Sequence, residues 1–130
     1  MRTRISIGVA LIIAVAAIAT ITAANLMPAR QSALIDLARP TIIAGVIASG
    51  QVIFVHDDER MANGEPCTTV YQYHSGKQGK KLVEFMCKPE QADRAEHFTA
   101  RCARGISAPD VLVEYQFKGD TETHGVPWRP

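Results

Sequence analysis

The chain has 130 residues, 14 Lys and Arg against 13 Asp and Glu, and 47% hydrophobic residues, which is the size of one small domain. The near-neutral charge excludes a polybasic nucleic-acid binder and a polyacidic buffer, so no nucleic-acid partner is expected. The sequence contains no P-loop, dinucleotide-binding glycine motif, haem-attachment CxxCH or pair of CxxC motifs. No cofactor is therefore expected.

The first 27 residues have the pattern of a membrane anchor. Arg2 and Arg4 are the only charged residues before an uncharged apolar run over residues 5–27. As a helix this run would extend roughly 34 Å, enough to cross a hydrocarbon core of about 30 Å. A secretory signal has a shorter apolar region of about 7–15 residues, although small residues at 22–24 are suited to signal cleavage. We expect a retained single transmembrane helix, with a signal peptide as the alternative.

The position of the two arginines predicts the orientation of this anchor. Positively charged flanks tend to remain in the cytoplasm, so the N-terminus is expected there and the rest of the chain in the periplasm, at the bacterial inner membrane. Small residues in the apolar run, Gly8 and Ala16 among them, permit close approach of a second helix. We expect them to contact subunits of an integral membrane complex. The alternative is that they face membrane lipid.

Residues 28–40 have a mild helical pattern. Ala33, Leu34 and Leu37 recur among polar and charged residues, and the pattern ends before Pro40. This spacing predicts a linker or short interfacial helix between the anchor and the domain that follows.

Residues 41–118 change to β-branched runs bounded by turn residues, which predicts an extracytoplasmic antiparallel β sandwich or barrel of about six strands. A tight turn is expected at Ser49-Gly50, and one helical turn over residues 89–96. Residues 119–130 contain turn formers and two prolines, which predicts an irregular tail. The expected strands are 41–48, 51–56, 67–74, 81–87, 97–104 and 111–117.

Two of the three cysteines meet in the expected hairpin between the third and fourth strands. If the loop from Ser75 to Gly79 pairs His74 with Lys80, Cys67 lies directly opposite Cys87. Directly opposed residues have Cα atoms about 4.5 Å apart, near the lower limit of disulfide geometry, and an exported domain favours oxidation. We therefore predict a Cys67–Cys87 disulfide.

Cys102 is the odd thiol in this scheme. It lies in an expected strand, where a buried, inert thiol is the simplest interpretation, and a bond with one of the other two cysteines is the alternative. Catalysis by Cys102 with a histidine is not expected, because an oxidising compartment and burial both disfavour a reactive thiolate. The sequence therefore predicts a protein that is not an enzyme.

A charged loop follows the second expected strand. His56, Asp57 and Asp58 group one imidazole with carboxylates, which makes them weak candidates for a metal site. Such a run is more often a solvated loop, and no second ligand pair follows at a diagnostic spacing. We therefore expect no metal site there.

The end of the chain carries its single tryptophan. Trp128 and Arg129 are residue types favoured at protein interfaces, and a proline-fixed tail docks on a partner at low entropic cost. We expect these two residues to bind a partner subunit. The alternative is that Trp128 packs against its own domain.

Several stretches of the sequence resemble a group of exported bacterial β-domain proteins without an assigned activity. The resemblance covers roughly residues 50–127 and implies export and a small β domain, with no activity. An anchor followed by such a domain is also similar in architecture to single-pass accessory subunits of bacterial photosynthetic reaction-centre and respiratory complexes. The similar stretches are FVHDDERM at 54–61, GEPCTTVY at 64–71, CKP at 87–89, EYQF at 114–117 and GDTE at 119–122.

These features together predict a non-catalytic accessory subunit with a single membrane pass. Its periplasmic β domain would cover or stabilise a membrane protein complex, such as a photosynthetic reaction centre or a respiratory electron-transfer complex. Its partners would be the subunits of that complex and membrane lipid. The alternative is a cleaved, soluble periplasmic domain that binds a cation or small ligand through the loop at 56–59.

Overall fold

The computed structural model describes residues 29–104, 106 and 109–129. The expected membrane segment, with Gly8 and Ala16, lies outside the described residues. Among the residues that are described, no helix has the length and hydropathy needed to cross a membrane.

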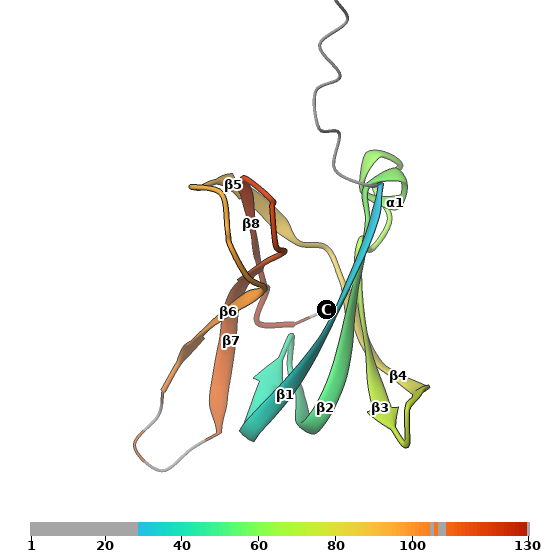
Figure 1. Cartoon of the computed structure of the whole chain (residues 1–130), viewed down its shortest axis with the longest axis vertical. Coiled ribbons are helices and arrows are strands. Elements are labelled where there is room, and N and C mark those ends of the chain that lie inside the picture. The colour runs from blue at the N-terminus through green and yellow to red at the C-terminus, as the bar shows by residue number, and fades with distance from the viewer. Residues whose placement is uncertain (1–28, 105, 107–108, 130) are drawn as a thin grey trace, which may run out of the picture.

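The described part of the chain consists of eight strands and one short helix (Figure 1). In chain order these are β1 (Arg30–Ile43), β2 (Val46–Asp57), α1 (Asp58–Ala62), β3 (Thr68–His74), β4 (Lys77–Phe85), β5 (Lys88–Gln91), β6 (Thr99–Ala103), β7 (Asp110–Gln116) and β8 (Glu122–Gly125).

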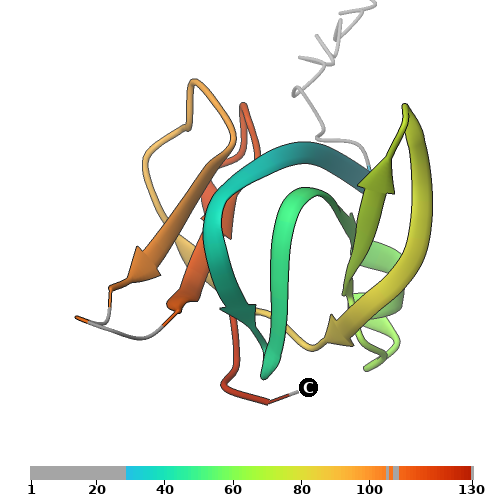
Figure 2. The ribbon, with the colours of Figure 1, turned by 90° about the horizontal axis from the view of Figure 1, so that it is seen from below.

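The strands form one strongly curled, mixed sheet. Its order is β4-β3-β2-β1-β7-β8-β5, with β6 paired to β7. Figure 2 shows β1 to β4 curving around one side of the interior and β6 to β8 on the other side. The prediction of a mainly β fold is confirmed, but the sheet is mixed, because β1 and β7 pair in parallel. Strand pairing does not close the sheet into a ring. The two edge strands, β4 and β5, do not pair with each other and are connected only along the chain, through Met86 and Cys87.

Residues 30–43 form strand β1, so the expected linker or helix over 28–40 is wrong. From Gln31 to Leu37 every second side chain is half-buried and those between are exposed, which is the period of a strand. The helical pattern was misleading because an apolar residue, Leu34, lies on the outer face and is 49% exposed. Pro40 interrupts the sequence but not the strand, because it falls in an irregularity between Leu37 and Thr41 where no pairing is recorded.

The first hairpin turns at Ala44-Gly45, so the turn expected at Ser49-Gly50 is wrong. Ala44 and Gly45 have φ values of 47° and 85°, as a two-residue hairpin turn of type I′ requires. Gly50 instead lies inside β2 with φ 70°. It faces Leu37 at the point where regular pairing with β1 breaks off, so its positive φ marks the bend of the sheet.

The β3–β4 hairpin has a tighter turn than expected. It turns at Ser75-Gly76, and His74 pairs with Lys77 instead of Lys80. Two irregularities between Val70 and Tyr73 offset most of this difference, so that Thr68 at the start of β3 pairs with Phe85 at the end of β4. The assumed register was therefore wrong, although the start of β3 and the end of β4 still meet.

Two short strands replace the irregular structure expected near the end of the chain. Residues 88–91 form β5 in place of a helical turn, and residues 122–125 of the expected tail form β8. β8 pairs with both β5 and β7. These strands have little apolar alternation of their own, so they depend on partners that are distant in the sequence.

The apolar core lies inside the curl of the sheet. Val52 and Phe54 on the inner face of β2 have no exposed surface, and Phe54 packs against Phe98 and Tyr115 with ring centroids 5.6 and 5.2 Å apart. Val70 and Leu112 complete this packing from β3 and β7. The next inward residue of β2 is a histidine, and there the character of the interior changes.

Candidate metal centre

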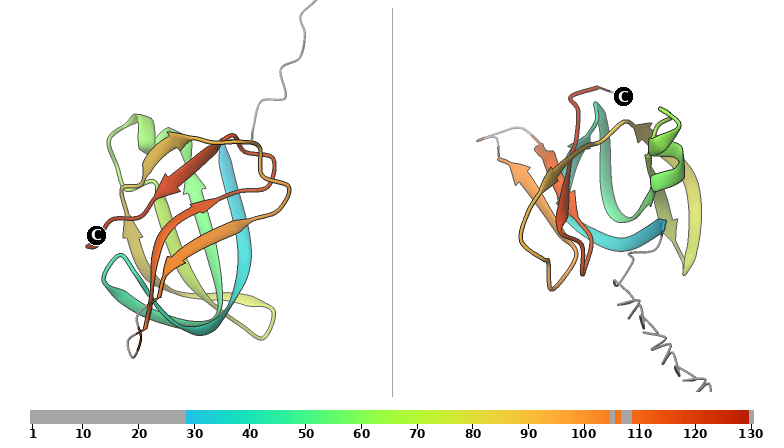
Figure 3. Two further views of the ribbon diagram at one scale, coloured as in Figure 1. Left: turned by 90° about the vertical axis from the view of Figure 1, so that its left-hand side faces the viewer. Right: turned by 90° about the horizontal axis from the view of Figure 1, so that it is seen from above.

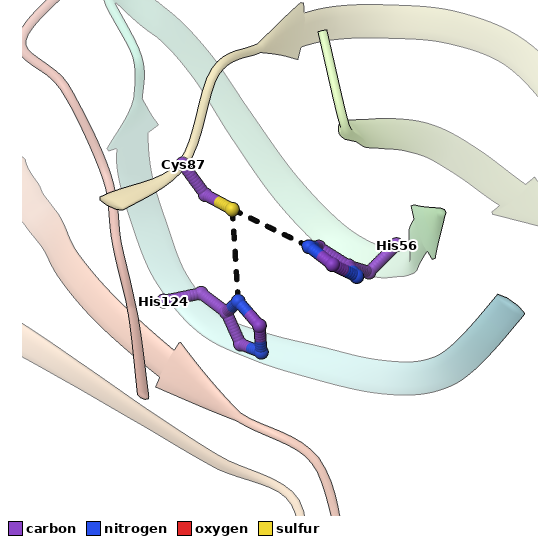
Figure 4. Close-up of side chains that lie close together, drawn as sticks. All are labelled: His56, Cys87 and His124. Carbon is purple, nitrogen blue, oxygen red and sulfur yellow. Dashed lines mark hydrogen bonds between the residues drawn. The ribbon is translucent and has the colours of Figure 1, made fainter. Parts of the chain in front are cut away.

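Two histidines and two cysteines meet at the end of the sheet nearest α1. Cys87 Sγ lies 3.4 Å from His56 Nε2 and 3.6 Å from His124 Nδ1 (Figure 4). Cys67 Sγ lies 2.9 Å from Cys87 Sγ. The ligand atoms of His56, Cys87 and His124 all lie within 4.8 Å of one another. We call these four residues the Cys–His cluster.

Four separate parts of the chain supply the cluster. His56 is the inward residue after Phe54 on β2, and it pairs with Thr68, which follows Cys67. Cys87 lies in the joint between β4 and β5. His124 lies on β8, at the end of the sheet that also carries β5 and α1 (Figure 3). The cluster therefore lies beside the joint between the two edge strands of the sheet, β4 and β5, which the chain connects but which do not pair.

The cluster is buried. His56, His124 and Cys67 are each 1% exposed, and Cys87 is 9% exposed. Tyr115 stacks on His124 with ring centroids 5.0 Å apart. The ring of Phe117 makes a T-shaped contact with the same imidazole, with ring centroids 6.1 Å apart. Burial of polar groups is unfavourable unless they are paired, so this concentration of imidazole and sulfur requires an explanation.

The outer nitrogen of each imidazole faces a carboxylate. His124 Nε2 is hydrogen-bonded to Asp120 Oδ2 at 3.2 Å. His56 Nδ1 lies 3.2 Å from Asp58 Oδ1, but without the alignment of a hydrogen bond, and it has no hydrogen-bond partner among the described residues. Histidines that ligate metals usually turn one nitrogen to the ion and the other to a carboxylate, carbonyl or water. His124 has this arrangement around Cys87, and His56 has a carboxylate near its outer nitrogen without a hydrogen bond to it.

The electrostatics of the cluster place two of its groups, Cys67 and His124, in the protonation state that binds a cation. The hydrogen bond between the sulfurs lowers the pKa of Cys67 to about 3 and, together with burial, raises the pKa of Cys87. The pair therefore loses its first proton easily and retains the second. Burial lowers the pKa of His124, so its imidazole is neutral near pH 7. Thiolate and neutral imidazole are the forms that bind metals.

The distances in the cluster can be compared with those of a tetrahedral zinc site. Metal–sulfur bonds of about 2.3 Å and metal–nitrogen bonds of about 2.0–2.1 Å place sulfur and nitrogen roughly 3.6 Å apart and two sulfurs roughly 3.8 Å apart. The two sulfur–nitrogen distances, 3.4 and 3.6 Å, fit this geometry. The sulfur–sulfur distance of 2.9 Å is shorter, so Cys67 Sγ would have to move outward. The two distances from Cys87 therefore fit a tetrahedral site as they stand, and Cys67 fits after a movement of about 1 Å.

A nucleophilic cysteine is the other chemistry that these residues suggest. Cys87, His124 and Asp120 follow one another as a nucleophile, a base and an orienting carboxylate would. A nucleophile must reach its substrate, whereas Cys87 is covered. This interpretation also leaves no role for the second thiol and the second imidazole, which a metal site uses. The geometry therefore favours metal binding.

The structure separates the residues that the sequence grouped as weak metal candidates. His56 belongs to the cluster and Asp58 stands behind it. Asp57 does not take part, because its side chain caps α1 by accepting hydrogen bonds from the backbone N–H groups of Glu59 and Arg60 at 3.0 and 3.2 Å. The sequence grouping did not include Cys87 and His124, which no spacing motif connects to His56.

The other expected site residues lie outside the cluster. Trp128 is 76% exposed and Arg129 is also exposed, so the described structure does not pack the tryptophan into its own core. Cys102 is half-buried on β6, where burial raises the pKa of its thiol. Cys67 and Cys87 are adjacent as free thiols, and the disulfide between them stays a prediction.

Comparison with known proteins adds no further assignment. No protein-family model, curated protein or solved structure matches the chain. The interpretation of the Cys–His cluster therefore depends on its geometry and chemistry.

Proposed function

We propose that this chain is a metal-binding protein whose β domain holds one thiophilic cation, Zn²⁺ or Cu⁺, between Cys67, Cys87, His56 and His124. The observation that carries this proposal is the placement of two imidazole nitrogens 3.4 and 3.6 Å from one buried cysteine sulfur. A second cysteine beside that sulfur and a carboxylate behind each imidazole support it.

The ligand types select the class of metal. Thiolate and imidazole favour Zn²⁺, Cu⁺ and similar ions, whereas Ca²⁺ and Mg²⁺ prefer oxygen ligands. Four protein ligands fill a tetrahedral site and leave no position for a substrate, which is the pattern of structural zinc sites. A non-catalytic role therefore agrees with the expectation from the sequence.

The location of the cluster suggests what the ion does for the fold. His56 lies on β2 and Cys67 immediately precedes β3, both on one side of the curl, and His124 comes from β8 on the other. Cys87 lies in the joint between the unpaired end strands. A bound ion would connect these segments at the place where the edge strands do not pair, so that metal–ligand bonds would close the curled sheet. An ion that binds only the folded state raises the free energy of unfolding by RT ln(1 + [L]/Kd), where [L] is the concentration of free ion.

The test is a metal titration of the full-length chain, purified in mild detergent under reducing, oxygen-free conditions. Zn²⁺ and Cu⁺ are added separately, each in competition with a chelator of known affinity, and bound metal is counted per chain. We expect one ion per chain for at least one of the two metals, and loss of binding in Cys87→Ser and His124→Ala. Cys102→Ser and His97→Ala are the matched controls and should bind as the wild type does.

Binding that survives in both Cys87→Ser and His124→Ala would contradict the site. Failure of the reduced, folded wild-type chain to bind either ion would contradict the function. Circular dichroism of each variant distinguishes a lost ligand from a lost fold.

A second proposal concerns the exposed tail. The exposure of Trp128 agrees with docking on a partner subunit, as an accessory subunit of a membrane complex requires. Mild extraction of native membranes, native separation and intact mass of this chain test that role. We expect the wild type to migrate in a large assembly and Trp128→Ala to be released from it. Migration of the wild type as a free monomer would contradict an accessory role.

A further inference from the structure

The sulfur pair in the Cys–His cluster lies between two chemical states. The sulfurs of Cys67 and Cys87 are 2.9 Å apart as thiols. A disulfide bond would bring them to about 2.05 Å, and a tetrahedral ion would hold them roughly 3.8 Å apart. Either state requires a displacement of about 1 Å, which thiol side chains can make by rotation. The same two atoms can therefore serve as metal ligands or as a redox pair.

The backbone keeps the two cysteine residues next to one another. The backbone N–H of Cys87 donates a hydrogen bond to Cys67 Sγ at 3.2 Å. The neighbouring residues Thr68 and Phe85 pair in the β3–β4 ladder, which fixes the start of β3 against the end of β4. The two cysteines thus stay close whether or not an ion is bound.

We infer that oxidation of Cys67 and Cys87 to a disulfide releases the metal, so that the cluster is a redox-controlled metal site. This inference rests on the proposed function. A disulfide sulfur has lost the thiolate charge that binds a thiophilic ion, so oxidation removes two of the four ligands at once. His56 and His124 remain, and two neutral imidazoles do not form a closed site.

The oxidation step requires an external disulfide as the oxidant. Cys87 lies in the joint between β4 and β5, and local opening of this joint admits the oxidant to it. As the thiolate, either held by the ion or formed by loss of its proton to solvent, Cys87 attacks a sulfur of that disulfide; a mixed disulfide forms and one thiolate leaves. Cys67 then attacks Cys87 Sγ, the Cys67–Cys87 bond forms and the second thiolate leaves. Two electrons pass from the two cysteines to the oxidant, the leaving thiolates take up protons from water, and both metal–sulfur bonds break.

The experiment loads the reduced full-length chain with Zn²⁺ and adds oxidised glutathione. A chromophoric chelator reports released zinc, and mass spectrometry reports the cross-linked peptides that contain Cys67 and Cys87. We expect one zinc ion released per disulfide formed, and rebinding after a dithiol reductant is added. The control Cys102→Ser should behave as the wild type does.

The effect of bound zinc on the rate of disulfide formation provides a second test. If only the metal-free protein is oxidised, free Zn²⁺ at 100 times Kd should slow disulfide formation about a hundredfold. In His124→Ala, which keeps both cysteines but loses a ligand, added zinc should give little or no protection. Neither comparison requires a variant that removes the sulfurs.

The outcomes separate this inference from the proposed function. If the reduced chain binds zinc and retains it after the Cys67–Cys87 disulfide has formed, the inference is wrong and the metal site remains. If the disulfide does not form under conditions that oxidise a model dithiol, the inference is also wrong. If the folded, reduced chain binds no thiophilic ion, the proposed function fails, and redox control of metal binding fails with it.

Discussion

The two halves of the interior differ in chemistry although the same strands line both. On the inner face of β2, Val52 and Phe54 pack in an apolar core, and two residues later His56 joins sulfur and imidazole groups. Both halves are almost completely buried. Apolar side chains gain free energy from this burial, whereas polar ones lose hydration unless they are paired. The apolar half thus stabilises the fold by burial alone, and under the proposed function the polar half contributes stability when an ion is bound.

Removing an aromatic side chain from the apolar half should have the largest effect. Phe54→Ala is expected to lower the free energy of unfolding by about 3–5 kcal/mol, because it leaves a cavity among Phe98 and Tyr115. Chemical denaturation in the presence of a chelator measures this effect without any contribution from metal. Ile47→Ala is the control, since Ile47 is 62% exposed and should change stability by less than about 0.5 kcal/mol. Equal losses in the two variants would contradict the assignment of the core.

Removing a ligand from the Cys–His cluster should abolish stabilisation by metal. At ion concentrations of 100–1,000 times Kd, the wild type should gain about 2.7–4.1 kcal/mol over the metal-free protein. His124→Ala should gain much less stability from zinc. Its stability in the presence of a chelator measures the separate effect of losing the side chain. Thermal unfolding with and without Zn²⁺ measures the difference. His74→Ala, a change at an exposed histidine, should retain the full gain; loss of the gain there would point to a different zinc site.

Changing the carboxylate behind an imidazole should weaken the site without removing it. Asp120→Asn is expected to reduce metal affinity about 10–100-fold, because Asp120 holds His124 Nε2 and orients Nδ1 toward Cys87. A chelator competition measures the dissociation constant. Asp36→Asn makes the same chemical change on the exposed face of β1 and should leave the affinity as it is. An unchanged affinity in Asp120→Asn would contradict the role of Asp120 in orienting His124.

Removing the cap of α1 should have the smallest effect, and only on stability. Asp57→Ala is expected to lower the free energy of unfolding by about 1 kcal/mol, because two backbone N–H groups lose their acceptor. Metal affinity should not change, and Asp57→Asn should restore most of the stability. A large loss of metal binding in Asp57→Ala would instead make Asp57 a ligand, as the sequence alone had weakly suggested.

Local sequence was sufficient for several of the strands but not for their ends or register. The expected strand at 67–74 matches β3 closely, because β-branched and aromatic residues alternate there between turn signals. At residues 30–43 the same reasoning failed, since Leu34 on the outer face imitated a helical pattern. The predicted β3–β4 register was wrong because the turn is shorter than expected. Two irregularities in the ladder offset most of the resulting shift, and local propensity does not reveal such irregularities.

The Cys–His cluster was harder to predict than the fold. Cys67 and Cys87 were expected to lie close together, and they do, because they flank one hairpin, 20 residues apart. His124 follows Cys87 by 37 residues and reaches it only through β8, a short strand without a clear pattern. Asp57, next to His56, was an equally plausible ligand from sequence and instead caps a helix.

The sequence by itself determined that this chain has a β-rich domain with two cysteines near one another, because alternation, β-branching and hairpin turns act over a few residues. Only the tertiary structure decided that two histidines converge on those cysteines. That convergence depends on the curl of the sheet and on the joint between β4 and β5, which bring distant segments together at one end. Long-range pairing of this kind is set by the packing of the whole domain, and no spacing within a short stretch of sequence encodes it.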